Sequence, residues 1–237
     1  MKTIELLKRL ERYPVFTEND VAKVVYKSPK YVRTLLYRLH KSGHIRRIEK
    51  GKYTLHEDPL IFSSHIVIPS YLSAWTALRH YNMTEQQPFS VFVVTTVQKQ
   101  PIRLGNAEIR FMASKLMFGF RKERYSDFDI FIADREKTVI DSLLFKLPLP
   151  DIIRALEDSE INCQRLVEYA RKTGNKSLMK RLGYLLEKTK GNAYGLSALD
   201  NNYVRLDYLE RKKGKKDRKW KLVLNDNTEG TGGHSKS

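Results

Sequence analysis

The sequence predicts an α+β fold, in which a short helical region is followed by a larger region that contains both strands and helices. First, 237 residues are enough for one or two domains of ordinary size. Second, with 41% hydrophobic and 11% aromatic residues, the chain can bury a core and is not a disordered protein as a whole. Third, apolar residues recur at helical spacing near both ends, whereas β-branched and alternating runs lie between residues 90 and 133.

The charge of the chain is strongly positive and unevenly distributed. The formal net charge is +17 and the isoelectric point is about 9.8, which favours a polyanionic partner, either nucleic acid or an acidic membrane surface. Residues 28–52 contain eight Lys or Arg and one acid, Glu49. Residues 211–221 contain another eight bases. This second run is consistent either with a further polyanion contact or with a solvated turn.

The sequence also bears on the compartment. No apolar run approaches the roughly 20 residues that span a bilayer. The first 16 residues interleave charges with leucines, which is not typical of a signal peptide. The one cysteine, Cys163, excludes an internal disulfide and a cysteine metal site, and its neighbours give no sign of activation. We therefore expect a cytoplasmic protein.

The first 25 residues predict two short helices. Residues 3–11 place Ile4, Leu7 and Leu10 at helical spacing, and Pro14 ends this helix. Thr17 is a favourable N-cap for a second helix. Asp20 lies three residues later, as in a capping box.

A third helix and a hairpin follow. Ser28 is the expected N-cap, and Pro29 occupies the first helical position, where a missing N–H costs nothing. Gly43 stands just beyond the helix end, as a left-handed cap does. Two β-prone runs around Gly51 then predict a hairpin. The apolar stripe of the helix is formed by Val32, Leu35, Leu36 and Leu39.

Helix, helix, turn, helix and hairpin is the order of a winged helix-turn-helix domain, which we assign to residues 1–58. The outward face of its third helix carries cations, hydroxyls and phenols, which bond to phosphate oxygens and to base edges in the major groove of DNA. The residues expected to bind DNA from this helix are Ser28, Lys30, Tyr31, Arg33, Thr34, Tyr37, Arg38 and Lys41. Those expected from the hairpin are Arg46, Arg47, Lys50 and Lys52.

The plain alternative is a solvated basic helix, or a winged helix used only for protein contacts. A solvated face usually alternates its charges, whereas this stretch contains a single acid, so we favour double-stranded DNA as the partner. Arg33 and Thr34, in the N-terminal half of the helix, are the candidates for base contact. Arg38 and Lys41 are the candidates for phosphate contact.

Residues 59–225 predict a larger α+β domain with a small, mostly antiparallel sheet followed by helices. Ser70 is the expected N-cap of a helix through residue 82. Strands are expected at residues 90–97, 101–105, 107–114 and 127–133. Later helical patterns lead to a hairpin of residues 204–210 with 219–225. Residues 226–237 are too polar and rich in Gly and Ser to pack, so a disordered tail is expected there.

A metal-dependent nuclease guided by a winged helix is a second hypothesis, because acids cluster between residues 127 and 141. These acids also have structural explanations: Asp134 is an N-cap, Glu136 lies in a first helical turn, and Asp127 and Asp129 alternate out of a strand. Histidines show no paired ligand spacing and no Gly-rich phosphate loop is present. We therefore expect a non-enzymatic protein without a metal or cofactor. The acids are Asp127, Asp129, Asp134, Glu136 and Asp141.

Several segments together resemble the AbiEi-like antitoxin regulators of type IV toxin–antitoxin systems. The helical N-terminal region is followed by IPSYLSAWTALRHYNM, VFVVTTVQK, AEIRFMAS, KLMFGF and IADREKTVIDSLLF. The resemblance covers roughly residues 5–225. The positions that match the two main motifs of that family are Pro69, Tyr71, Ser73, Ala77, Leu78, His80, Ala133, Glu136, Lys137 and Asp141.

This resemblance implies a DNA-binding repressor of its own operon that acts at inverted repeats, with the antitoxin activity in the C-terminal domain. It also implies a functional partner, a nucleotidyltransferase-like toxin that need not touch the antitoxin. Inverted repeats are compatible with a homodimer, although the sequence leaves the oligomeric state open. Members of the family without a toxin neighbour are plain regulators, and this alternative stays open too. The family provides no catalytic residue to carry over.

Overall fold

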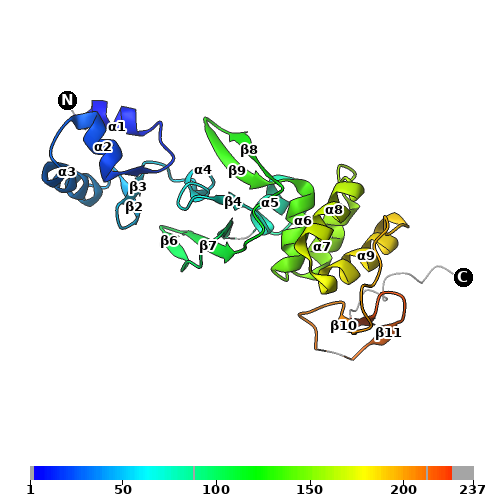
Figure 1. Cartoon of the computed structure of the whole chain (residues 1–237). Helices are drawn as coiled ribbons and strands as arrows, with labels where there is room; N and C mark the ends of the chain where they lie inside the picture. The colour runs from blue at the N-terminus through cyan, green and yellow to red at the C-terminus, as the bar shows by residue number, and fades with distance from the viewer. Residues whose placement is uncertain (1–2, 88, 212, 226–237) are drawn as a thin grey trace, which may run out of the picture. The chain divides into compact units, whose positions relative to one another are not determined.

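The computed structural model of the chain describes residues 3–87, 89–211 and 213–225 (Figure 1), so the predicted disordered tail, 226–237, lies outside the described residues. Both helices and β-sheets are present, so the predicted α+β class is confirmed. The chain forms two compact units. Unit 1 comprises residues 1–77 and 86–133, and unit 2 comprises residues 78–85 and 134–237. The domain boundary predicted after residue 58 lies inside unit 1.

The N-terminal part of unit 1 contains three helices and a small antiparallel sheet of order β1-β3-β2 (Figure 1). The predicted capping box at Thr17 and Asp20 is confirmed, because the Thr17 hydroxyl accepts from the Asp20 N–H and the Asp20 carboxylate accepts from the Thr17 N–H. Gly51 has a φ of 79° in the turn between β2 and β3. The elements are α1 (Thr3–Leu10), β1 (Phe16–Thr17), α2 (Glu18–Val25), α3 (Pro29–Lys41), β2 (Arg46–Glu49) and β3 (Lys52–Thr54).

These short elements share one apolar core. Each helix contributes one stripe, and Phe16, Ile45 and Tyr53 add side chains from the strands and the turns beside them. Burial of each such side chain stabilises the fold by about 1.5–3 kcal/mol. Nine described side chains are buried there: Leu6, Leu10, Phe16, Val21, Val32, Leu36, Leu39, Ile45 and Tyr53.

The rest of unit 1 is a six-stranded sheet of order β6-β7-β5-β4-β9-β8. Three of its neighbouring pairs are antiparallel, whereas β5–β7 and β4–β9 are parallel. The four predicted strands are present, but the sequence did not predict β4 or β8. The elements are α4 (Pro59–Ser63), β4 (Ser70–Leu72), β5 (Ser90–Thr95), β6 (Ile102–Leu104), β7 (Ala107–Ala113), β8 (Phe120–Tyr125) and β9 (Phe128–Ala133).

The prediction that Ser70 caps a helix was wrong. Ser70 begins β4 in the middle of the sheet, where its hydroxyl donates to the Ser64 carbonyl over 3.0 Å. Tyr71 and Leu72 are fully buried between neighbouring strands, which explains why this segment is extended. The helix begins only at Trp75, as α5 (Trp75–His80).

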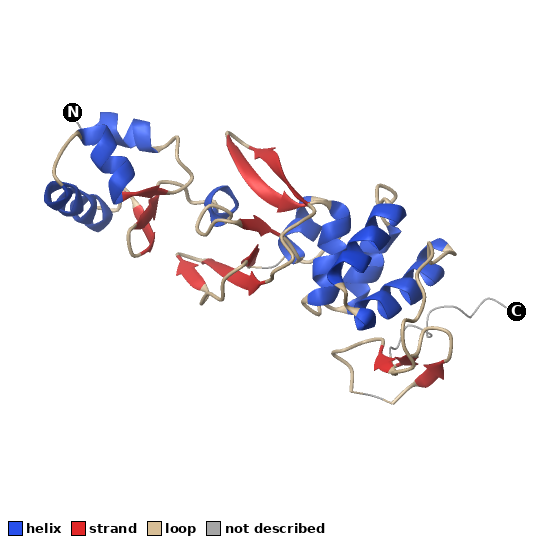
Figure 2. Ribbon diagram, in the orientation of Figure 1, coloured by secondary structure: helices blue, strands red, loops and turns tan. Residues whose placement is uncertain are grey.

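Unit 2 is built mainly from four helices, which gather in Figure 2. The predicted N-cap Asp134 is confirmed, because its carboxylate accepts from the Lys137 N–H over 2.7 Å. Gly174 and Gly191 end two of these helices in the left-handed conformation. The helices are α6 (Arg135–Leu144), α7 (Leu149–Glu157), α8 (Cys163–Thr173) and α9 (Lys176–Lys190).

A small three-stranded sheet follows α9, in the order β10-β12-β11. The predicted hairpin of residues 204–210 with 219–225 was wrong, because β10 and β12 run parallel. The hairpin is instead formed by β11 and β12, so part of the predicted basic loop is a strand. The strands are β10 (Val204–Arg205), β11 (Lys215–Asp217) and β12 (Leu222–Leu224).

Candidate nucleic-acid interface

The third helix, α3, has one buried face and one exposed face. Ser28 caps it as predicted, since the Tyr31 N–H donates to the Ser28 hydroxyl over 3.4 Å. Val32, Leu36 and Leu39 point into the core. The eight residues that the sequence assigned to DNA binding from this helix are all exposed and therefore share the outward side: Ser28, Lys30, Tyr31, Arg33, Thr34, Tyr37, Arg38 and Lys41.

The cations on this face have no counter-charge within the described part of the chain. No Asp or Glu of the described residues forms an ion pair with Lys30, Arg33, Arg38 or Lys41. Four positive charges on 13 helical residues repel one another, and an anionic partner relieves that repulsion. The face is thus electrostatically prepared for a polyanion.

A hollow of about 390 Å³ opens at the N-terminal half of the same face. Tyr31 is 52% exposed, and the Thr34 hydroxyl donates to the Lys30 carbonyl over 3.1 Å. Hydrogen-bond donors, the Tyr31 phenol and the apolar side chain of Leu35 thus line the same concave surface. Its lining consists of Ser28, Lys30, Tyr31, Thr34, Leu35 and Arg38.

The turn before α3 adds a residue that the sequence analysis missed. Tyr26 is 87% exposed and has a φ of 53°, so it ends α2 in the left-handed conformation. A large side chain rarely adopts this conformation. Its phenol and the exposed Lys27 extend the polar surface next to Ser28. The clue in the sequence was the short connection of three residues, 26–28, between the two helices, because the chain must turn sharply within it.

Two of the four predicted hairpin cations are exposed. Arg47 lies on the outer side of β2, where its Nε is 3.4 Å from the Glu49 carbonyl. Lys50 lies in the exposed turn between the two strands, and no ion pair joins it to another described residue. Arg47 and Lys50 are therefore the hairpin side chains that are accessible to a ligand.

The other two hairpin cations are half-buried and have partners within unit 1. Arg46 pairs with the exposed carboxylate of Glu57. Lys52 lies 3.0 Å from a Glu49 carboxylate oxygen and also donates to the Ile66 carbonyl. Their charges are therefore used in contacts within unit 1. Of the four cations that the sequence predicts in the hairpin, only Arg47 and Lys50 are exposed.

Glu49 joins the hairpin to the edge of the six-stranded sheet. Lys99, in the loop before β6, donates to Glu49 over 2.5 Å. Burial raises the pKa of Glu49, but the hydrogen bonds from Lys99 and Lys52 outweigh it and hold the pKa below its ordinary value. The single acid of the basic stretch is therefore a structural anchor and does not neutralise α3.

Four of the five acids that suggested a nuclease have structural partners: Asp129, Asp134, Glu136 and Asp141. Asp129 lies 3.0 Å from the Lys122 ammonium and 3.7 Å from an Arg124 guanidinium nitrogen. Asp134 caps α6 and also accepts a hydrogen bond from the Tyr169 hydroxyl over 2.8 Å. Burial, and next this bond to Asp134, raises the pKa of Tyr169 to about 12.

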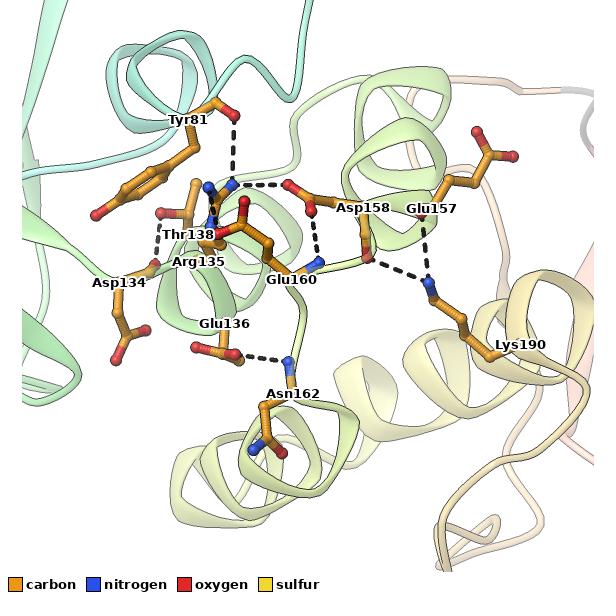
Figure 3. A network of polar contacts seen from close by, with 10 residues as sticks. All are labelled: Tyr81, Asp134, Arg135, Glu136, Thr138, Glu157, Asp158, Glu160, Asn162 and Lys190. Atoms are coloured by element: carbon orange, nitrogen blue, oxygen red, sulfur yellow. Dashed lines mark hydrogen bonds and ion pairs between the residues drawn. The ribbon is translucent and has the colours of Figure 1, made fainter.

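Glu136 and the neighbouring polar groups tie the helices of unit 2 together (Figure 3). The Glu136 carboxylate accepts from the Asn162 N–H over 2.7 Å. Arg135 donates to Asp158 over 2.7 Å, and it lies 2.8 Å from a Glu160 carboxylate oxygen. Within residues 3–87, 89–211 and 213–225, no three His, Cys, Asp or Glu side chains are grouped as metal ligands would be.

Comparison with known proteins gives no assignment. Neither a protein-family model nor the sequence of a curated protein matches this chain. Among the described helices, none has the length and apolar character required to cross a membrane.

Proposed function

We propose that residues 1–58 form a winged helix-turn-helix domain and that the chain is a sequence-specific, non-enzymatic transcriptional regulator that binds double-stranded DNA. The observation that supports this most is the exposed face of α3, whose four cations lack a carboxylate partner among the described residues. In such domains the third helix lies in the major groove and the hairpin contacts the backbone beside it.

Individual roles follow from position and exposure. Arg33 and Thr34 are proposed to contact base edges, and Arg38 and Lys41 to contact phosphates. Exposed hydroxyls and phenols next to them suit phosphate oxygens. In the hairpin, the exposed Lys50 and Arg47 are the stronger candidates, because Arg46 and Lys52 already have acidic partners.

The resemblance to AbiEi-like antitoxins adds a narrower proposal. The chain is then a cytoplasmic antitoxin that represses its own operon at inverted repeats, as a homodimer or as two separate copies. Its functional partner would be a nucleotidyltransferase-like toxin that it need not touch. A regulator without a toxin is the alternative, and a nucleotidyltransferase gene beside the gene for this chain would favour the antitoxin.

A gel-shift series on DNA from upstream of the gene tests the DNA-binding proposal. If each copy neutralises on the order of 4–6 phosphates, the logarithm of the binding constant should fall against the logarithm of salt concentration with a slope of about −4 to −5. A flat salt response, or equal affinity for unrelated duplexes, would contradict specific operator binding. Competition with structured RNA separates this function from an RNA-binding one, since RNA should compete poorly.

A metal-dependent nuclease is the weaker alternative, because four of its five candidate acids are engaged in caps, hydrogen bonds or ion pairs. Incubation of plasmid DNA with Mg²⁺ or Mn²⁺ distinguishes the two. We expect the plasmid to stay intact, whereas nicking that Asp129→Ala abolishes would favour the nuclease.

A further inference from the structure

A second candidate site lies in unit 2, where α9 meets the β11–β12 hairpin. A hollow of about 470 Å³ opens there, which is within the range of small-ligand sites, about 300–1,000 Å³. It lies in unit 2, whereas the residues proposed to bind DNA all lie in unit 1. Its lining consists of Tyr184, Glu187, Lys188, Lys215, Lys216, Asp217, Trp220 and Leu224.

One lining residue, Trp220, is fixed in place. Its side chain is 1% exposed, and its indole N–H donates to Glu187 over 2.7 Å. Its backbone N–H donates to Asp217 over 2.6 Å. A Cβ atom at Gly183 would lie 2.1 Å from the indole ring, so only glycine at this position of α9 lets the ring pack. This part of the wall is therefore rigid before any ligand arrives.

Both acids of the lining are already engaged. Glu187 accepts from the Trp220 indole and from the Lys219 ammonium. Burial raises the pKa of Glu187, but these two hydrogen bonds outweigh it and keep the pKa below its ordinary value. Asp217 accepts from the Trp220 backbone. Neither carboxylate is thus committed to the three lysines of the lining.

Those lysines have no carboxylate partner among the described residues. Lys188 lies 5.7 Å from the centre of the Tyr184 ring, and Lys216 lies 5.1 Å from that of Tyr203. Lys215 forms no ion pair with any residue that the structure describes. All three lysines contribute to the lining of the hollow, and lysine ammonium groups donate charge-assisted hydrogen bonds to anions.

We propose that this hollow binds a small phosphate-bearing ligand of nucleotide size. Phosphate oxygens suit ammonium donors, and the half-buried ring of Tyr184 offers an apolar contact to a planar base. The concave shape between a helix and a hairpin favours a small molecule over an extended nucleic-acid backbone. The site stands independently of DNA binding by α3, so failure of either proposal leaves the other intact.

The test uses the full chain and the fluorescence of Trp220. The chain has two tryptophans, so Trp75→Phe leaves Trp220 as the only reporter. We expect ATP and inorganic pyrophosphate each to give a saturable change in emission. Isothermal titration calorimetry on the natural chain gives the same affinity without any substitution.

Substitution of the three lysines shows whether the hollow is the binding site. Lys188→Gln, Lys215→Gln and Lys216→Gln together should weaken ATP binding by about 10- to 100-fold, because each lost charge-assisted bond weakens affinity. The matched control, Lys146→Gln, Lys172→Gln and Lys176→Gln, removes the same charge elsewhere in unit 2 and should bind normally. Circular dichroism should show that both variants fold like the natural chain.

Three results would overturn the proposal. ATP and pyrophosphate could produce no saturable change at millimolar concentration by either method. The control could lose affinity as much as the triple variant, which would indicate general charge attraction. Duplex DNA could change Trp220 emission through the same lysines while ATP does not, which would make the hollow a second nucleic-acid contact.

Discussion

Two capped helices use their charges in opposite ways. Helix α3 exposes its cations, and no described carboxylate neutralises them. Helix α6 instead buries Glu136, Lys137 and Asp141, and the Lys137 ammonium pairs with Asp141 one turn later. The number of charged residues is similar, but the partners differ. A helix whose charges are paired internally holds a fold together, whereas a helix whose charges lack partners is available to a ligand.

The physical reason lies in desolvation. A charge removed from water must be paired, because breaking a buried pair by removing one member costs about 3–5 kcal/mol. An exposed ion pair contributes at most about 1 kcal/mol, so little stability is lost when a surface cation has no partner. Evolution can therefore leave α3 unpaired at low cost to folding, but it cannot do so for α6.

Lys137→Met should have the largest effect on stability, since it leaves the Asp141 carboxylate buried without its ammonium partner. We expect the free energy of unfolding to fall by about 3–5 kcal/mol. Urea denaturation followed by circular dichroism measures this loss. A change below about 1 kcal/mol would show that the buried pair is not what distinguishes α6.

Two further variants make this comparison sharper. Replacing both partners, Lys137→Met with Asp141→Leu, should recover much of the stability, because no charge is then left unpaired. On α3, Lys41→Met removes a cation of the same type from an exposed position. Its effect on unfolding should stay within about 0.5 kcal/mol.

Unlike Lys137→Met, Arg33→Ala should weaken DNA binding without lowering the stability of the protein. We expect the affinity for the specific DNA site to fall by about 1–3 kcal/mol while the unfolding free energy hardly changes. Fluorescence anisotropy with specific and unrelated duplexes measures the loss of sequence preference. Lys23→Ala, on the exposed side of α2, is the control and should bind normally. Equal losses for the two variants would refute a base contact by Arg33.

The N-caps of α6 and α3, Asp134 and Ser28, allow a comparison with a smaller expected effect on stability. Asp134→Ala should destabilise the protein by about 1–2 kcal/mol, because Asp134 caps α6 and also accepts from the Tyr169 hydroxyl. Ser28→Ala should cost about 0.5–1 kcal/mol, because the Ser28 cap is exposed and its hydrogen bond is 3.4 Å long. Thermal unfolding of both variants measures the order, and the reverse order would show that Asp134 is not a structural anchor.

Local features of the fold could be predicted from the sequence. Thr17, Ser28 and Asp134 were identified as N-caps because each precedes an apolar helical stripe. In the structure each of them accepts a hydrogen bond from the backbone N–H three residues later. The exposed face of α3 followed from the same spacing. The hollow at the N-terminal half of α3 could not be predicted in this way, and neither could the exposure of Tyr26. Both depend on the geometry of the turn before α3, which spacing alone does not specify.

Long-range pairing could not be predicted. Ser70 resembled a helix cap because a helical pattern follows it, but pairing with strands far along the chain makes it extended. The parallel pairing of Val204 with Leu222 likewise depends on a crossover that no local pattern encodes. The same limit applies to charge. Lys52 and Lys50 look alike in sequence, and only the fold brings Lys52 to Glu49.

Glu49 is neither fully exposed like the cations of α3 nor fully buried like the ion pair of α6. Its substitution is expected to have the smallest effect on stability. Its carboxylate is 25% exposed and is held by Lys99 and Lys52, which keep its pKa below the ordinary 4.5 despite burial. A lowered folded-state pKa means that its contribution to stability is present above pH 4.5 and is lost as the pH falls through the folded-state value. Between pH 7 and pH 3, Glu49→Gln should therefore lose less stability than the natural chain, as measured by urea denaturation. Glu57→Gln, whose carboxylate is 82% exposed, should lose as much as the natural chain. If the acid response of Glu49→Gln matched that of Glu57→Gln, Glu49 would be a surface acid like any other, and the separation of anchoring charges from available ones would not extend to the hairpin.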